Sequence, residues 1–201
     1  MALLKARRLD YPFIPEQVEA LRAGQFVLVS GLVYTARDRI HKYLFDGGKS
    51  PVDLKNSALY HCGPVVIRKD AGWVVRAAGP TTSLREEPYL PRIVKEHGIR
   101  VIMGKGSMGK VTEGACKAGG CVYLHAVGGA AQVLAEKVVA VKGLYFGEEF
   151  GLAEAMWVLE LKDFPAIVAI DSKGRNLLRR VKSASLRMGR KLMKSSDPFI
   201  P

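Results

Sequence analysis

Apolar residues in the first half of the chain occur in short runs, which predict strands. Residues 25–34 (QFVLVSGLVY) run apolar with several β-branched side chains, as is typical of a buried strand. Shorter runs are separated by Gly-containing or Asp-Ala-Gly turns, so we expect a small all-β subregion here. The expected strands are 3–9, 25–34, 59–61, 65–68 and 73–78, and the expected helices are 15–21 and a segment from 35 to about Gly47.

After residue 78 the pattern changes to an alternation of helices and strands joined by glycine-containing links. Such an alternation is typical of an α/β layer, so we predict an α/β fold. The expected helices are 83–97, 107–118, 127–137 and 175–191, and the expected strands are 101–103, 121–124, 138–146, 155–161 and 166–170. We expect residues 195–201 to form a loose tail.

The length and composition indicate one domain. With 201 residues, 48% of them hydrophobic, the chain can bury one substantial core. We expect a single domain over residues 1–201, with a basic C-terminal helix and a short tail. No apolar run reaches the roughly 18 residues of a membrane helix, and the N-terminus lacks the apolar segment of a signal peptide. We therefore expect a soluble, cytoplasmic protein without a membrane partner.

The charge is strongly basic, with 31 Lys and Arg against 19 Asp and Glu and a net charge of +12. Such an excess fits nucleic acid, an acidic partner protein or an anionic substrate. Much of it lies at the two ends, in residues 5–8 and 175–194, which indicates solvated or partner-facing surface. The chain has no aromatic-interleaved basic strand and no zinc-finger spacing, so a nucleic-acid partner is not favoured.

Two polar loops predict an anion site. Residues 79–85 read Gly-Pro-Thr-Thr-Ser-Leu-Arg, and residues 104–106 read Gly-Lys-Gly, on either side of the helix expected at 83–97. Thr81, Thr82 and Ser83 supply hydroxyls and backbone N–H groups at a helix start, and Arg85 and Lys105 supply positive charge. An ordinary N-cap needs one hydroxyl, so three of them with Arg85 favour a bound carboxylate or phosphate. The nucleotide-binding Walker pattern is absent, because Lys105 precedes the second glycine.

Residues 35–41 place Arg37, Arg39 and His41 close to the end of the buried strand at 25–34. Arg37 suits a bidentate carboxylate clamp, but a solvated first helical turn capped by Asp38 fits the residue types equally well. His61 is compatible with a strand residue at a sheet edge and has no further pattern to support catalysis.

The three cysteines suggest a metal site only weakly. Cys62, Cys116 and Cys121 could supply three thiolates to an iron–sulfur cluster, but their spacing matches no cluster signature. Cys116 lies on an expected amphipathic helix and Cys121 begins an apolar strand, so buried structural thiols are favoured. An odd number of cysteines also fits a reducing compartment better than a disulfide framework.

Taken in order along the chain, these motifs resemble the beta subunit, or C-terminal half, of class I fumarate hydratases and the related L-tartrate dehydratases. The matching motifs are Ser30-Gly31, Thr35-Ala36-Arg37-Asp38 with His41, Cys62-Gly63-Pro64, Gly79-Pro80-Thr81-Thr82-Ser83 with Arg85, Gly104-Lys105-Gly106, Val127-Gly128-Gly129-Ala130-Ala131, Glu154-Ala155-Met156-Trp157, Asp163-Phe164-Pro165 and Asp171-Ser172-Lys173-Gly174. The resemblance implies a swivelling, three-layer β/β/α domain. It also implies a [4Fe–4S] hydro-lyase whose cluster is held by three cysteines of a separate alpha subunit, so that this chain ligates no metal.

In that family the residues identified above bind a dicarboxylate substrate. By resemblance Arg37, Arg85 and Lys105 bind the carboxylates, with Thr81 and Thr82 close to the reacting carbons, and Thr81 is the candidate proton-abstracting base. A hydroxyl is a costly base, so Thr81 would need activation by the adjacent cations or a relay partner.

The resemblance leaves the substrate open between fumarate/malate and tartrate, and fumarate is preferred as the commoner one. A non-catalytic anion- or nucleic-acid-binding module is the alternative from another class. Only the basic C-terminal helix favours it.

Overall fold

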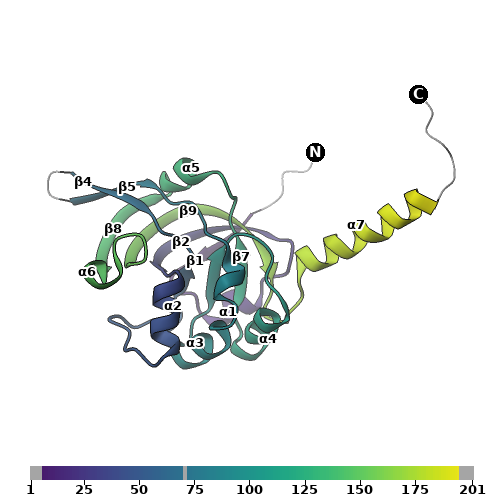
Figure 1. Ribbon diagram of the computed structural model, residues 1–201, viewed down its shortest axis with the longest axis horizontal. Helices are drawn as coiled ribbons and strands as arrows, with labels where there is room; N and C mark the ends of the chain where they lie inside the picture. The colour runs from purple at the N-terminus through teal and green to yellow at the C-terminus, as the bar shows by residue number, and fades with distance from the viewer. Residues whose placement is uncertain (1–5, 70–71, 195–201) are drawn as a thin grey trace.

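Helices and strands alternate along most of the chain in the computed structural model, which describes residues 6–69 and 72–194 (Figure 1). The predicted α/β class is confirmed. The strands are β1 (Arg7–Asp10), β2 (Phe26–Thr35), β3 (Ala58–Tyr60), β4 (Val65–Lys69), β5 (Gly72–Ala77), β6 (Val101–Gly104), β7 (Val122–His125), β8 (Val138–Tyr145) and β9 (Met156–Ile170). The helices are α1 (Pro15–Glu19), α2 (Asp38–Phe45), α3 (Leu90–His97), α4 (Lys110–Gly119), α5 (Ala131–Ala135), α6 (Gly147–Phe150) and α7 (Leu177–Lys194), with a 3₁₀ turn at Ser83–Glu86.

Seven of the strands form one sheet that closes on itself. Its order is β1-β2-β3-β6-β7-β9-β8, and β9 also pairs with β2. The pairings β2–β3, β3–β6 and β6–β7 are parallel, whereas β9 runs antiparallel to β2, β7 and β8. The carboxyl ends of β2, β3, β6 and β7 therefore lie at one edge, where ligands bind in many α/β proteins.

The core consists of two apolar clusters on opposite faces of β3, β6 and β7. Tyr60, Met103 and Leu124 point to the first cluster, which the closed sheet surrounds. Ile102 and Tyr123, one position away on the same strands, point to the second cluster with residues of α2, α3 and α4. Because side chains alternate along a strand, strands buried on both faces are apolar at nearly every position. That explains the continuous apolar runs in the sequence.

The strand pair predicted at 155–161 and 166–170 is wrong, because one continuous strand, β9, covers both. The register against β2 shifts between Val29 and Gly31, so β9 carries a bulge opposite Ser30. Asp163 has a positive φ of 50° there, and its N–H donates to Ser30 Oγ at 3.0 Å. A bulge bends a strand without ending it. Asp163 and Pro165 are residue types typical of turns, so the sequence predicts a turn here.

The single helix predicted over 83–97 is also wrong. The structure has a 3₁₀ turn at Ser83–Glu86, and α3 begins only at Leu90. Pro88 explains the interruption, because its ring lacks an N–H group and would clash with the Leu84 carbonyl in a continuous helix. Pro91 lies in the first turn of α3, where proline is tolerated.

Smaller differences concern the ends of elements. The all-β subregion predicted in the first half reduces to the two-stranded sheet of β4 and β5, since β3 joins the main sheet. The helix predicted at 127–137 shortens to α5, because Gly128 and Gly129 belong to the preceding loop, and α6 was not predicted. The predicted basic C-terminal helix is confirmed as α7, while the expected tail at 195–201 lies outside the described residues. Within the described part of the chain, no helix has the length and apolar character needed to cross a membrane.

Candidate active site

The two loops predicted to form an anion site lie directly side by side. The Lys105 N–H donates to the Thr81 carbonyl at 3.2 Å, and the Ser83 N–H donates to the Lys105 carbonyl at 3.1 Å. Thr81 also donates its N–H and its hydroxyl to the His61 carbonyl, at 2.7 and 3.0 Å. The segment from Thr81 to Ser83 is therefore held between the carboxyl ends of β3 and β6.

These contacts correct the predicted mechanism of anion binding. The N–H groups of Thr81 and Ser83 already bond to carbonyls of the neighbouring strand ends, so they are not available to an anion. Only a short 3₁₀ turn follows them, and it cannot supply the dipole of a long helix. The N–H groups of Thr81 and Ser83 therefore cannot carry anion binding at this edge, which leaves the positively charged side chains as its main source.

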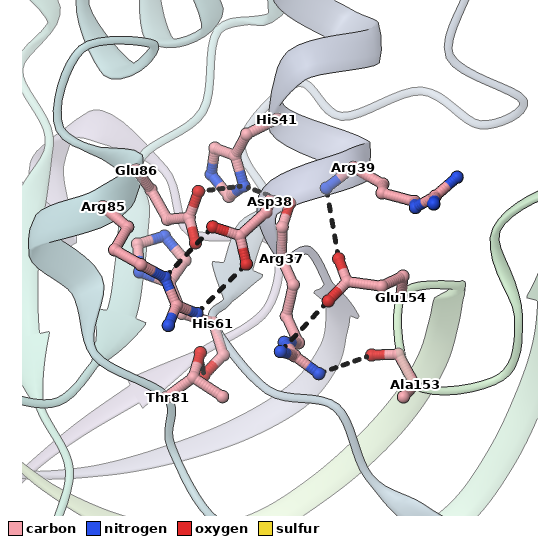
Figure 2. Close-up of polar contacts among 10 residues, drawn as sticks. All are labelled: Arg37, Asp38, Arg39, His41, His61, Thr81, Arg85, Glu86, Ala153 and Glu154. Atoms are coloured by element: carbon pink, nitrogen blue, oxygen red, sulfur yellow. Dashed lines mark hydrogen bonds and ion pairs between the residues drawn. The ribbon is translucent and has the colours of Figure 1, made fainter.

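Arg85 is held by a carboxylate of α2. Its Nε donates to Asp38 Oδ1 at 3.1 Å, and one Nη donates to Asp38 Oδ2 at 3.0 Å (Figure 2). The two side chains are 50% and 46% exposed, so water reaches the pair. The other Nη takes no part in this pair, and Thr82 is exposed nearby in the chain. Arg85 is thus oriented and still accessible to an anion.

Arg37 is held in the same way by a second carboxylate, from the segment before β9. Its Nη2 lies 3.0 Å from Glu154 Oε1, and its Nη1 donates to the Ala153 carbonyl at 3.3 Å (Figure 2). Glu154 Oε2 accepts a hydrogen bond from the backbone N–H of Arg39 at 3.1 Å. Glu154 rather than Asp38 therefore caps a free N–H group in the first turn of α2. Gly63 permits this arrangement, because a Cβ there would lie 2.7 Å from Arg37 Nη1.

Behind these ion pairs lies a cluster of three buried titratable side chains, His41, His61 and Glu86 (Figure 2). The two imidazole rings meet edge to face, with centroids 4.9 Å apart. His41 Nδ1 donates to the Arg37 carbonyl at 3.0 Å and lies 3.8 Å from Glu86 Oε2. Both nitrogens of His61 and both carboxyl oxygens of Glu86 have no hydrogen-bond partner among the described residues.

Burial keeps this cluster uncharged around neutral pH. It lowers the pKa of His41 to about 4 and holds the pKa of His61 well below the usual value, with His41 and Arg85 lowering the latter further. Burial also raises the pKa of Glu86 to about 8, and the negative charge of Asp38 adds to that increase. The short distance between His41 and Glu86 is therefore a contact between neutral groups rather than an ion pair.

Lys105 follows β6 and lies beside the loop after β7, since a Cβ on Gly128 would be 3.4 Å from Lys105 Cδ. The residue before it, Gly104, allows Ser83 to approach the strand. A Cβ on Gly104 would lie 1.9 Å from Ser83 Oγ, which accepts the Tyr123 hydroxyl at 3.1 Å. Close packing of the 79–85 segment against β6 thus fixes the position of the Lys105 backbone.

The structure brings together the predicted residues Arg37, Thr81, Thr82, Arg85 and Lys105 at the edge where β2, β3 and β6 end. Sequence reasoning assigned no role to Glu86 or Glu154 and treated Asp38 only as a helix cap. Glu154 lies in one of the quoted motifs, but its contact with the N–H of Arg39 spans 115 positions. No local spacing could have indicated it.

The cysteines do not fit an iron–sulfur cluster. All three are buried and carry free thiols. Cys62 lies in the first apolar cluster, inside the closed sheet, and Cys116 and Cys121 lie in the second. Burial raises the pKa of Cys62 to about 12, which disfavours the thiolate that a metal requires. Among the described residues, no group of three or more His, Cys, Asp and Glu side chains could hold a metal ion. The described residues therefore offer no set of side chains suited to ligate a cluster.

Comparisons with known proteins place the chain in a family. The sequence model described as Fumarase C-terminus matches residues 4–181. A Geobacillus stearothermophilus protein that bears the name fumarate hydratase class I is 50% identical over 179 residues, which cover 89% of this chain. The chain spans only about a third, 34%, of that relative's length.

Two shorter relatives match over most of their length. A Methanocaldococcus jannaschii protein that bears the name L(+)-tartrate dehydratase subunit beta is 39% identical over 181 residues, covering 86% of this chain and 93% of its own. The L(+)-tartrate dehydratase subunit beta of Escherichia coli (strain K12) is 32% identical over 176 residues, covering 87% of each chain. The predicted resemblance is confirmed, and the chain belongs to the fumarase C-terminus family.

Proposed function

We propose that this chain is the beta subunit of a two-subunit hydro-lyase that reversibly hydrates fumarate to L-malate. The observation that carries the proposal is the convergence of Arg37, Arg85 and Lys105 with Thr81 at one open edge of the sheet. Two guanidinium groups and an ammonium suit a small dianion with two carboxylates. The exposure of Arg85 and Thr82 leaves the site open, as expected of half of a shared active site.

In this proposal the cations bind both substrate carboxylates. A proton on the carbon next to a carboxylate is only weakly acidic, and compensating the charge of that carboxylate makes its removal easier. Arg37 and Arg85 are pre-oriented by Glu154 and Asp38, so little side-chain freedom is lost when the substrate binds. Thr82 contributes a hydroxyl to the substrate beside Thr81.

Thr81 is the proposed proton acceptor. Its hydroxyl donates to the His61 carbonyl, so the lone pairs of Oγ1 remain directed elsewhere. A neutral hydroxyl accepts a proton poorly, and it becomes an effective base only after its own proton has passed to water at the open edge of the site. Arg85 and Lys105 favour the resulting alkoxide by their positive charge.

A [4Fe–4S] cluster on a separate alpha subunit completes the proposed site in a cytoplasmic complex. It supplies a Lewis acid to the substrate hydroxyl. The three-layer, swivelling β/β/α description also belongs to the proposal. Two apolar clusters on opposite faces of β3, β6 and β7 support the layers. Swivelling would close the open edge on the partner and exclude water.

A second candidate is the beta subunit of an L-tartrate dehydratase. The relatives from M. jannaschii and E. coli that carry this name match over most of their own length, which favours it. L-Malate and tartrate differ by one hydroxyl. In both proposals Arg37, Arg85 and Lys105 bind the substrate carboxylates.

One experiment tests both candidates. The chain is co-expressed with a cluster-bearing alpha subunit encoded with it, iron and sulfide are reconstituted anaerobically, and fumarate, malate and L-tartrate are assayed in parallel. Turnover of fumarate and malate above tartrate supports the first proposal, and the reverse order supports the second. An intact, cluster-loaded complex that turns over none of the three contradicts the hydro-lyase function and leaves the non-catalytic module.

A further inference from the structure

Helix α7 leaves the body of the molecule as a single projecting helix (Figure 1). Its first turn is anchored, because Arg179 pairs with Glu113 at 2.9 Å and Leu178 packs against the second apolar cluster. Farther along, Val181 and Met188 are 55% and 58% exposed. An isolated helix of this length is only marginally stable in water, so its outer turns lack the packing that normally stabilises a helix.

Five apolar residues of α7 lie along one side of the helix and form a narrow stripe, whereas the exposed Leu186 and Met193 lie on the other side. Leu177, Val181, Ala184 and Met188 follow one another at intervals of four, three and four, which places them on one side of the helix, and Leu192 extends that side. This spacing is typical of the seam along which one helix packs on another. A wide apolar face, as in a helix that lies on a membrane, is not present.

Apart from Leu186 and Met193, the remaining surface of α7 is mainly basic. Its sequence contains seven Lys and Arg residues and no Asp or Glu. Arg180 and Arg187, one heptad apart, flank the stripe on one side, where charged residues select the partner of a helix pair. Two copies of α7 would bring like charges together, so the stripe does not fit a second copy of this chain.

A lipid surface fits less well than a protein. Basic helices that lie on anionic membranes carry Trp, Phe and Leu on a broad apolar face. Helix α7 contains no aromatic residue, and its stripe includes the small side chain of Ala184. Small residues in a seam allow a partner helix to approach closely, whereas they add little to membrane binding.

The family match ends at residue 181, so the outer turns of α7 lie beyond the shared part of the sequence. We propose that the Leu177–Met188 stripe of α7 docks against an acidic amphipathic helix of the cluster-bearing alpha subunit. This inference rests on the proposed function, from which it takes the identity of the partner. Part of the binding free energy between the two subunits would then come from a surface away from the reacting groups.

A matched pair of variants tests the proposal. Met188→Asp places a charge in the stripe, whereas Leu186→Asp places the same charge on the opposite side of α7 at a similarly exposed position, 53% against 58%. Both variants change the net charge equally, so only the stripe distinguishes them. We expect Met188→Asp to raise the Kd for the purified alpha subunit about tenfold and Leu186→Asp to leave it within about twofold.

The assay measures Kd by titrating the full chain with the cluster-loaded alpha subunit, and kcat at saturating alpha subunit. An unchanged kcat with the expected difference in Kd supports docking through the stripe. Equal Kd values for the two variants, or no complex at all, overturn it.

Two further measurements separate other occupants and the function itself. Binding to phosphatidylglycerol vesicles that Met188→Asp abolishes, without any change in Kd for the alpha subunit, overturns the proposal in favour of lipid. Self-association of the chain that the same variant abolishes overturns it in favour of a second copy. A complex that depends on Met188 but turns over no substrate supports docking and removes the hydro-lyase function.

Discussion

The ion pairs at the edge of the candidate site and the buried cluster behind them hold their titratable side chains in opposite states. The ion pairs are charged, whereas the buried cluster is neutral. The Arg85–Asp38 ion pair is about half exposed, so water reaches both side chains. Glu86 follows Arg85 in sequence, yet it is fully buried and its pKa rises to about 8. A difference of one position in the chain thus separates a charged, solvated side chain from a neutral, buried one.

The comparison indicates a division of work. Arg85 at the edge is available to a substrate, and Asp38 orients it at low cost because water reaches the pair. Side chains in the cluster cannot ionise cheaply, so they support the edge by packing and add no charge to it. We therefore expect variants at the edge to change activity and variants in the cluster to change stability.

The largest effect is expected from Arg85→Ala. If Arg85 clamps a carboxylate, kcat/KM of the reconstituted complex falls by at least ~10²-fold, because a charge-assisted bidentate contact contributes a few kcal/mol. Arg39→Ala is the matched control, since the Arg39 side chain points away from the site and its N–H contact with Glu154 is retained (Figure 2). Near-normal kcat/KM in Arg85→Ala would remove Arg85 from the site.

A packing change behind the edge is expected to change stability rather than activity. Gly104→Ala places a Cβ against Ser83 Oγ, and we expect the free energy of unfolding to fall by about 2 kcal/mol. Gly114→Ala in α4 meets no atom within 4 Å and should instead raise it by up to about 1 kcal/mol, because alanine favours a helix. Urea unfolding of the isolated chain measures both. Equal changes in the two variants would contradict the close packing of the 79–85 segment.

The protonation of Glu86 predicts a pH dependence of stability. Its pKa is higher in the folded chain, about 8, than the 4.5 of an ordinary glutamate, so the folded state binds more protons between these values. Its contribution to stability is therefore complete below about pH 4.5 and is lost as the pH rises toward 8. Glu86→Gln retains the shape of the side chain and removes this dependence.

The measurement is the difference in unfolding free energy between the natural chain and Glu86→Gln at several pH values. We expect the natural chain to lose stability relative to the variant from pH 4.5 to 8. His41 has the opposite dependence, lost as the pH falls from about 6.5 to 4, and it is present in both proteins. A flat difference would mean that Glu86 is ionised in the folded chain. The exposed Glu16→Gln serves as the control for a change of net charge.

The smallest effect is expected from Asp38→Asn. Exposed ion pairs contribute little, so the unfolding free energy should change by less than about 1 kcal/mol. The orientation of Arg85 is lost, and we expect kcat/KM to fall by about three- to tenfold with most of the change in KM. A decrease as large as that of Arg85→Ala would mean that Asp38 itself contacts the substrate.

Local sequence patterns predicted the strands of the sheet well and its interruptions poorly. The apolar run at 25–34 became β2, since burial on both faces leaves a strong signal. The bulge at Asp163 and the break at Pro88 were misread, because a bulge resembles a turn and Ser83–Glu86 resembles a helix start. The bulge depends on the pairing with β2, whereas the break has a local cause in Pro88.

The candidate site follows the same rule. The chemistry of Arg37, Thr81, Thr82, Arg85 and Lys105 was recognisable from residue types and motif order alone. Their environment was not, because Asp38 reaches Arg85 and Glu154 reaches Arg37 from other elements. Neither the engaged N–H groups of Thr81 and Ser83 nor the neutral state of Glu86 has a local signature.

The sequence by itself determined the α/β class, the family and the positive charge at the candidate site, because apolar periodicity and residue chemistry are local properties. Only the tertiary structure decided which charges are paired, which are buried and which remain open to a substrate. Those properties depend on the distance between groups and on their access to water, which the closure of the sheet through β9 and the packing of α2 against the 79–86 segment establish.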